Sequence, residues 1–442
     1  MPQADHDYAD IPVFAGHPLL DLQQSDLIVL HEGDLLLRKR DDTEWAAGSG
    51  RVFIDASRGL HFRFEWFGPL PDGFDSASVV LPNATSGPEL ELSFDGFEPV
   101  KAHYERSRLV FGDKDSHFSG VLEGGWFLSR PRIDRIHFFV FNLQDLHGAK
   151  LRNGRGCFLG RTEFNVGDTW KVQIDILPSD ARTKVSPACI GIFALQKSES
   201  FDGEAAEAAL TLLDRLFLLI NGGWAGVYGA VAVDSTDAVI GWLQRFTHRP
   251  SKHRRPCEAW PTLSEFELDA IAAELNSKQT DSDFTDALDV ALHWRACAYR
   301  PGGNLEEELV SGCIALESLA YNHLVGKHVI DASSFDRMAR SDAVSIALKL
   351  AGVSVAVPTA MQELTKRCAA LNVRNGPQAI FLARNDFVHH RRKSRWRVAD
   401  KVDQVTAEYE LLHLLRAYTD FLAFHTVNST SYLRFPWNEP GT

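Results

Sequence analysis

The stretch Arg384-Asn385-Asp386-Phe387-Val388-His389-His390 holds the arrangement of side chains in this chain that most resembles a reactive site. Read at about 100° per residue, its surroundings form a helix with an apolar side. That side consists of Ile380, Phe381, Phe387 and Val388. Arg384 and Arg391 project into the middle of this apolar stripe, where a guanidinium needs a partner.

The polar residues of the stretch separate onto two flanks of the predicted helix. Asn385 and His389 are four residues apart and stack on one flank, whereas Asp386 and His390 stack on the opposite flank. Arg384 is always charged, and an imidazole titrates near neutral pH. Together they supply anion stabilisation and proton transfer, which are the two requirements for cleaving a phosphodiester.

The pattern R-N-x-x-x-H, late in an all-helical region, resembles the signature of the HEPN superfamily. Arg384, Asn385 and His389 match it with four residues between Arg and His, and His390 matches with five. Upstream, Leu309 to Leu319 resembles the "aLExL" helix of ApeA-like HEPN proteins from bacterial anti-phage systems, and the helix at Ala287 to Trp294 fits the same layout. The resemblance covers Phe284 to Leu433.

The resemblance implies a metal-independent endoribonuclease without a cofactor, acting as a toxin or abortive-infection effector. RNA supplies its own nucleophile, the 2′-hydroxyl. In this scheme His389 moves the proton, Arg384 stabilises the charge on phosphorus oxygens, and Asn385 orients His389 or contacts phosphate. Glu317 is the candidate for holding Arg384. The residues expected to bind RNA are Arg391, Arg392, Lys393, Arg395 and Arg397.

The same residues also have a structural interpretation. In it Arg384 forms an ion pair with Glu317, His389 and His390 are ordinary half-exposed histidines, and the basic run is solvated. The chain would then be a non-catalytic HEPN module for dimerisation and for RNA or partner binding. A further alternative is a carbohydrate- or peptide-binding β-domain with a helical dimeriser.

The predicted assembly is a homodimer through the helical domain. Arg384 and His389 are separated by about 140° around one helix, so a single helix does not aim both at one phosphate. Two copies facing each other across a symmetry axis do, and HEPN nucleases are generally built from paired motifs. A phage-derived trigger is the other expected partner, sensed by the β-rich part.

Composition limits the other function classes. The chain has 442 residues, 45% hydrophobic and 24% charged, which is typical of a soluble globular protein of two or three domains. Its net charge of −13 argues against a surface that wraps duplex nucleic acid, so any contact with nucleic acid must be local. The six cysteines are scattered without C-x-x-C pairs, which predicts a cytoplasmic protein. No P-loop pattern is present.

The expected fold is α+β multidomain. Alternating strands and turns over residues 1–200 predict a β-rich sandwich or barrel-like sensing domain, for example Trp170 to Ile176, with His31 to Gly33 and Val166 to Asp168 among the turns. Residues 201–275 read as a mixed α/β connection, and residues 284–433 as an HEPN-like helical bundle. Leu216 to Val233 is uncharged, but its glycines indicate a helix end, a turn and a strand rather than a membrane span.

Overall fold

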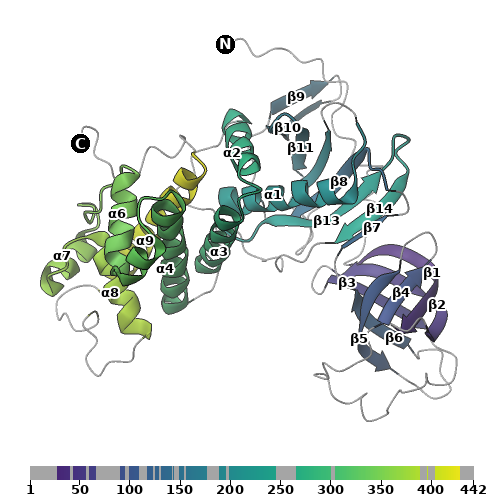
Figure 1. Cartoon of the computed structure of the whole chain (residues 1–442), viewed down its shortest axis with the longest axis horizontal. Helices are drawn as coiled ribbons and strands as arrows, with labels where there is room; N and C mark the ends of the chain where they lie inside the picture. The colour runs from purple at the N-terminus through teal and green to yellow at the C-terminus, as the bar shows by residue number, and fades with distance from the viewer. Residues whose placement is uncertain are drawn as a thin grey trace. The chain divides into compact units, whose positions relative to one another are not determined.

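Figure 1 shows the computed structural model of the chain. It describes residues 27–39, 43–55, 59–65, 90–94, 99–108, 117–122, 125–128, 131–141, 143, 149–153, 156–176, 189–195, 199–244, 265–299, 304–388, 396 and 404–428. The chain forms two compact units. The strand-rich unit holds residues 1–163, 169–210 and 226–252, and the helical unit holds residues 164–168, 211–225 and 253–442.

Six strands of the strand-rich unit close into an antiparallel barrel in the order β1-β2-β3-β6-β5-β4. Their bounds are β1 Leu27–Lys39, β2 Glu44–Asp55, β3 Gly59–Glu65, β4 Leu90–Phe94, β5 Val100–Arg108 and β6 His117–Leu122. Alternate residues point inward, as the burial of Leu35, Leu37, Val52 and Phe62 shows. A closed barrel leaves no exposed sheet edge.

The turn predicted at His31 to Gly33 is wrong, because these residues lie within β1 and pair with β2. A bulge between Val29 and His31 absorbs the local irregularity. Glu32 is an outward strand position that forms an ion pair with Arg51 at 2.9 Å. Of the residues taken for a turn, Glu32 lies on the solvent side of the strand, whereas His31 packs its ring against Phe94 at 5.1 Å.

The other eight strands form one sheet in the order β7-β14-β13-β8-β12-β11-β10-β9. Their bounds are β7 Gly125–Leu128, β8 Arg135–Phe141, β9 Ala149–Asn153, β10 Gly156–Val166, β11 Trp170–Ile176, β12 Cys189–Leu195, β13 Gly226–Val233 and β14 Val239–Gln244. β11 begins and ends where the alternation predicted. The turn before it is also confirmed, since Gly167 adopts a φ of +58°.

The C-terminal region is helical, which confirms the predicted α+β multidomain class. The helices are α1 Gly203–Asn221, α2 Glu265–Ser277, α3 Ser282–Ala298, α4 Leu305–Tyr321, a π-helix at Asn322–Gly326, α5 Ala332–Arg337, α6 Arg340–Leu350, α7 Gln362–Leu371, α8 Gly376–Val388 and α9 Gln404–Thr426. α3 starts at a polar cap, where the Asp281 side chain accepts a hydrogen bond from the Phe284 amide.

The uncharged stretch Leu216 to Val233 is the end of α1, a turn and strand β13, as its glycines predicted. Among the described residues, no helix is both long enough and apolar enough to cross a membrane.

A buried ion pair joins α3 to α9 in the helical unit. Arg295 and Asp420 are each only 1% exposed, and the Arg295 Nε donates to Asp420 Oδ1 at 2.6 Å. The Arg295 Nη1 also donates to the backbone carbonyls of Leu218 and Leu219, at 3.1 and 2.9 Å, near the C-terminal end of α1. The Arg295 guanidinium thus connects α3, α9 and the end of α1.

We expect Asp420→Ala to lower the free energy of unfolding of the helical unit by about 3–5 kcal/mol, because it leaves the Arg295 charge buried without its carboxylate. Chemical denaturation followed by circular dichroism measures this loss. The control is Lys366→Ala, which removes an exposed pair with Glu363 and costs less than about 1 kcal/mol. Equal, small losses in the free energy of unfolding of the two variants would contradict the conclusion that the Arg295–Asp420 ion pair holds these helices together.

Candidate functional site

The predicted motif lies at the C-terminal end of α8, and the helix is anchored through its first half. Ala379, Ile380, Phe381 and Ala383 are buried. Of the other two residues on the predicted apolar side, Phe387 is half-buried and Val388 is 46% exposed.

Arg384 is half-buried, and its Nε is buried without a hydrogen-bond partner. Its Nη1 donates to Asn385 Oδ1 at 3.1 Å. Burial raises the pKa of the Cys313 thiol on α4, and the positive charge of Arg384 acts on that pKa in the opposite direction. The guanidinium therefore lies within electrostatic reach of the buried side of α4.

The expected ion pair between Arg384 and Glu317 is not formed. The Glu317 carboxylate instead accepts from Arg340 Nε at 2.6 Å, and Arg340 also packs its guanidinium over the Phe335 ring at 4.8 Å. Arg340 competes successfully because it begins α6 and its Nη1 is held by the Phe335 carbonyl at 2.9 Å. Within the described ranges, Arg384 has no carboxylate at ion-pair distance.

The remaining predicted site residues lie outside the described residues: His389, His390, Arg391, Arg392, Lys393, Arg395 and Arg397. Their roles stay predictions. Between them Trp396 is described and is buried, with 0% exposure. Its amide donates to the Asp386 carboxylate, and its ring lies 5.5 Å from the guanidinium of Arg367. Asp386, on the flank opposite Asn385, therefore anchors the chain beyond the motif.

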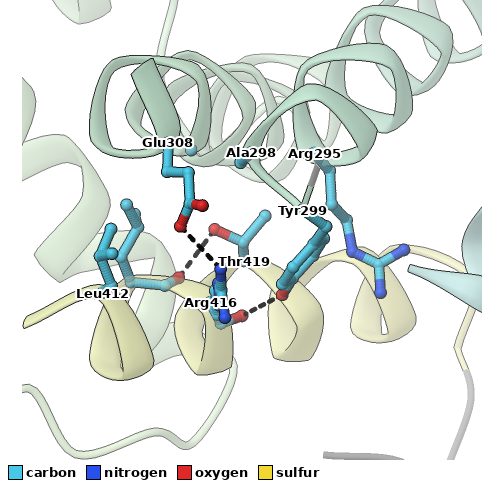
Figure 2. Close-up of a pocket in the computed structure, with 9 residues that line it drawn as sticks. Arg295, Ala298, Tyr299, Glu308, Leu412, Arg416 and Thr419 are labelled. Atoms are coloured by element: carbon cyan, nitrogen blue, oxygen red, sulfur yellow. Dashed lines mark hydrogen bonds and ion pairs between the residues drawn. The ribbon is translucent and has the colours of Figure 1, made fainter. Parts of the chain in front are cut away.

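A small cavity lies between α3, α4 and α9, beside the buried ion pair (Figure 2). On one wall Glu308 of α4 accepts from Arg416 Nη2 of α9 at 2.8 Å, and the Tyr299 hydroxyl donates to the Arg416 carbonyl at 3.3 Å. The cavity has a volume of about 10 Å³ for the centre of a water-sized sphere. It is therefore large enough for about one water molecule. Substrate pockets are far larger, so this cavity belongs to the packing.

Sequence reasoning missed the buried charges around this cavity. Arg295, Arg416 and Asp420 lie in helices among mainly apolar neighbours, whereas Glu308 follows two other glutamates. A charged residue on the apolar side of a predicted helix is the signal that marks them, because such a residue requires a partner.

Two histidines meet where the π-helix packs on the end of α9. The rings of His323 and His425 are 4.9 Å apart, and His323 Nε2 lies 3.2 Å from Thr426 Oγ1. Burial lowers the pKa of His323 to about 3, and the charges of Lys327, His425 and Lys278 act the same way, against a hydrogen bond with the Leu422 carbonyl. Burial also lowers the pKa of His425. Both rings are neutral at pH 7.

No group of three or more His, Cys, Asp or Glu side chains suited to a metal ion occurs within the described part of the chain.

The comparisons with known proteins divide the chain as its architecture does. Residues 129–247 match the family model described as the YopA central domain, and residues 281–428 match the one described as the YopA C-terminal domain. The first segment holds the sheet from β8 to β14 together with α1, and the second holds α3 to α9. The chain is thus an α+β protein with a YopA-like sheet region and a YopA-like helical region.

A particular relative is "SPbeta prophage-derived uncharacterized protein YopA" of Bacillus subtilis (strain 168), to which the chain is 20% identical over 396 residues, 85% of each protein. No solved structure matches. Neither matching family description names the HEPN superfamily, so that resemblance stays a prediction.

The neutral His323 predicts a loss of stability in acid. Its folded-state pKa lies below the ordinary value of about 6.5, so at intermediate pH the unfolded chain binds the extra proton. The free energy of unfolding therefore falls as the pH falls below about 6.5, by up to about 1.4 kcal/mol per pH unit. Denaturation curves at pH 7, 6 and 5 measure this slope.

His323→Gln should reduce the slope near pH 5 by about that amount. The matched control is His328→Gln, at the exposed histidine beyond the π-helix, which should keep the parent slope. An unchanged slope in His323→Gln would show that another group takes up the proton.

Proposed function

We propose that this chain is a metal-independent endoribonuclease of HEPN type that cleaves RNA through its 2′-hydroxyl. Arg384 stabilises the charge on the phosphate, His389 transfers the proton, and Asn385 sets the position of the arginine or histidine. The protein needs no cofactor in this reaction. The scaffold alternative is an HEPN-like module that binds RNA or a partner without cutting.

The proposal rests on the burial and the hydrogen bonding of the Arg384 guanidinium. Its Nε is buried without a partner, its Nη1 donates to the neutral amide of Asn385, and the carboxylate expected to hold it is paired with Arg340. A half-buried guanidinium without a carboxylate favours an anion from outside the chain. A phosphate oxygen fits this need, because Arg presents a fork of N–H donors that matches phosphate geometry.

The chain beyond the motif is anchored to the helical unit at Trp396. Asp386 holds the amide of Trp396, and burial fixes the Trp396 ring beside Arg367. The proposed phosphate-binding residues belong to the sequence between and around these anchors. They are Arg391, Arg392, Lys393, Arg395 and Arg397.

The proposed active form is a homodimer through the helical unit, since one helix does not aim Arg384 and His389 at one phosphate. The proposed place of action is the cytoplasm, where RNA substrates occur. A relative of this chain carries a name that describes it as prophage-derived. A toxin released by a phage-derived trigger and sensed through the strand-rich unit fits such a setting.

We expect the purified chain to cut mixed RNA in the presence of EDTA, because no metal takes part. Replacing the 2′-oxygen at the cut by hydrogen should stop cleavage, and the 5′ fragment should end in a 2′,3′-cyclic phosphate. Gel electrophoresis and mass spectrometry of the fragments measure both. The rate per chain should rise with protein concentration as the dimer forms.

Arg384→Ala should abolish the cut, whereas Arg374→Ala, at an exposed arginine just before α8, should leave it unchanged. RNA binding by the whole chain without any cleavage product would favour the scaffold alternative. A cut that requires a divalent metal would reject the proposed mechanism.

The two histidines should differ. His389 shares its flank with Asn385, so His389→Ala should reduce cleavage by at least about a hundredfold, the ordinary contribution of a general acid or base. His390→Ala should retain most of the activity. Single-turnover rates on one RNA measure the difference, with circular dichroism confirming the fold. Comparable losses of activity in the two variants would contradict the choice of His389 and would favour the pattern with five residues between Arg384 and His390.

A further inference from the structure

Two arginines stand directly opposite each other on the outside of the barrel. Arg51 of β2 pairs in register with Arg63 of β3, and both side chains are exposed. Their inward neighbours Val52 and Phe62 are 1% and 0% exposed, which fixes the arginines on the outer face. Like charges directly opposite each other destabilise a strand pair, so this placement has a cost.

The row that contains these arginines continues across neighbouring strands. On one side Glu32 of β1 pairs in register with Arg51, and their side chains form an ion pair at 2.9 Å. On the other side the register runs from Arg63 to Ser119 of β6 and on to Arg106 of β5. The described side chains of this row are thus two arginines, Arg51 and Arg63, with the acid Glu32 and the neutral Ser119. We call it the arginine row.

Elsewhere the barrel follows the ordinary rule of alternating charge. Glu91 of β4 pairs in register with Arg38 of β1 on one side and with Lys101 of β5 on the other. Arg38 also pairs in register with Glu44. This second row neutralises itself, so the excess positive charge of the arginine row is a local feature in a chain whose net charge is −13.

An aromatic pair lies next to the arginine row on the same face. Phe53 and His61 are two residues from Arg51 and Arg63, they pair in register, and their rings stack at 5.9 Å and 20°. Phe53 is half-buried, whereas His61 is buried. Single-stranded nucleic acids bind where cations meet the backbone beside aromatic rings on which bases stack. Small barrels present such sites on the outer face of their strands.

We propose that the arginine row of the barrel binds the phosphates of single-stranded RNA. This inference deepens the proposed function, because it assigns substrate binding to a surface separate from Arg384. Arg51 and Arg63 contact successive phosphates, and Glu32 competes with the RNA for Arg51. Binding here involves no bond cleavage, so it is measured independently of any nuclease activity.

The test uses the full chain and a fluorescent 2′-O-methyl oligoribonucleotide of about 12 nucleotides, which lacks the 2′-hydroxyl that cleavage requires. Anisotropy titrations give Kd across a series of salt concentrations. The variant Arg51→Gln with Arg63→Gln should raise Kd about tenfold or more. It should also reduce the slope of log K against log salt by about 1.4, at about 0.7 for each phosphate that the variant no longer neutralises.

The matched control is Lys101→Gln, in the self-neutralised row, which should leave Kd within about twofold. Glu32→Gln should tighten binding, because it releases Arg51, and this opposite sign separates a binding role from damage to the fold. Unchanged binding in the double variant, or an equal loss in the control, would overturn the proposal. Equal affinity for double-stranded DNA would also overturn it, by showing a site for polyanions in general.

A chain that binds this oligonucleotide through the arginine row but never cuts RNA would retain this proposal and reject the nuclease. If Arg384 is required for cleavage but the double variant Arg51→Gln with Arg63→Gln binds the oligonucleotide with unchanged Kd, the nuclease proposal stands and the arginine-row proposal is rejected.

Discussion

The helical unit depends on the buried pair between Arg295 and Asp420. An arginine that is 1% exposed cannot shed its charge, so its donors must be matched inside the protein. Asp420 supplies a carboxylate, and the end of α1 supplies the carbonyls of Leu218 and Leu219. Because carbonyls at a helix C-terminus carry partial negative charge, they suit a cation. The partners thus fix the mutual positions of α3, α9 and the end of α1.

The need of a buried guanidinium for a partner separates Arg384 from Arg416 and Arg340 in the helical unit. Arg416 is held by Glu308 at 2.8 Å and Arg340 by Glu317 at 2.6 Å. Both are structural on that ground. Arg384 differs, since its Nη1 donates to the uncharged amide of Asn385 and no carboxylate among the described residues lies at ion-pair distance from it. Incomplete matching at a half-buried cation marks the place where the fold gives up local stability, and functional sites are where proteins tolerate this.

The sequence predicted the elements whose residues alternate or repeat locally. Strand β11 and the turn at Val166 to Asp168 follow from period-two alternation and from turn residues close together in the sequence. The wrong predictions concern residues whose partners lie far away in the sequence. Glu317 had two candidate arginines, and the start of α6 decided for Arg340. His31 to Gly33 reads locally as a turn, and only pairing with β2 makes it a strand.

A net charge of −13 bears on both proposed RNA surfaces. The surrounding acidic residues repel a polyanion, so each proposed surface would have to attract phosphate locally against this repulsion. If Arg384 and the arginine row both contact RNA, the binding comes from a few cations close to the phosphates and not from the overall charge of the chain. Added salt should then weaken the contact at each surface separately.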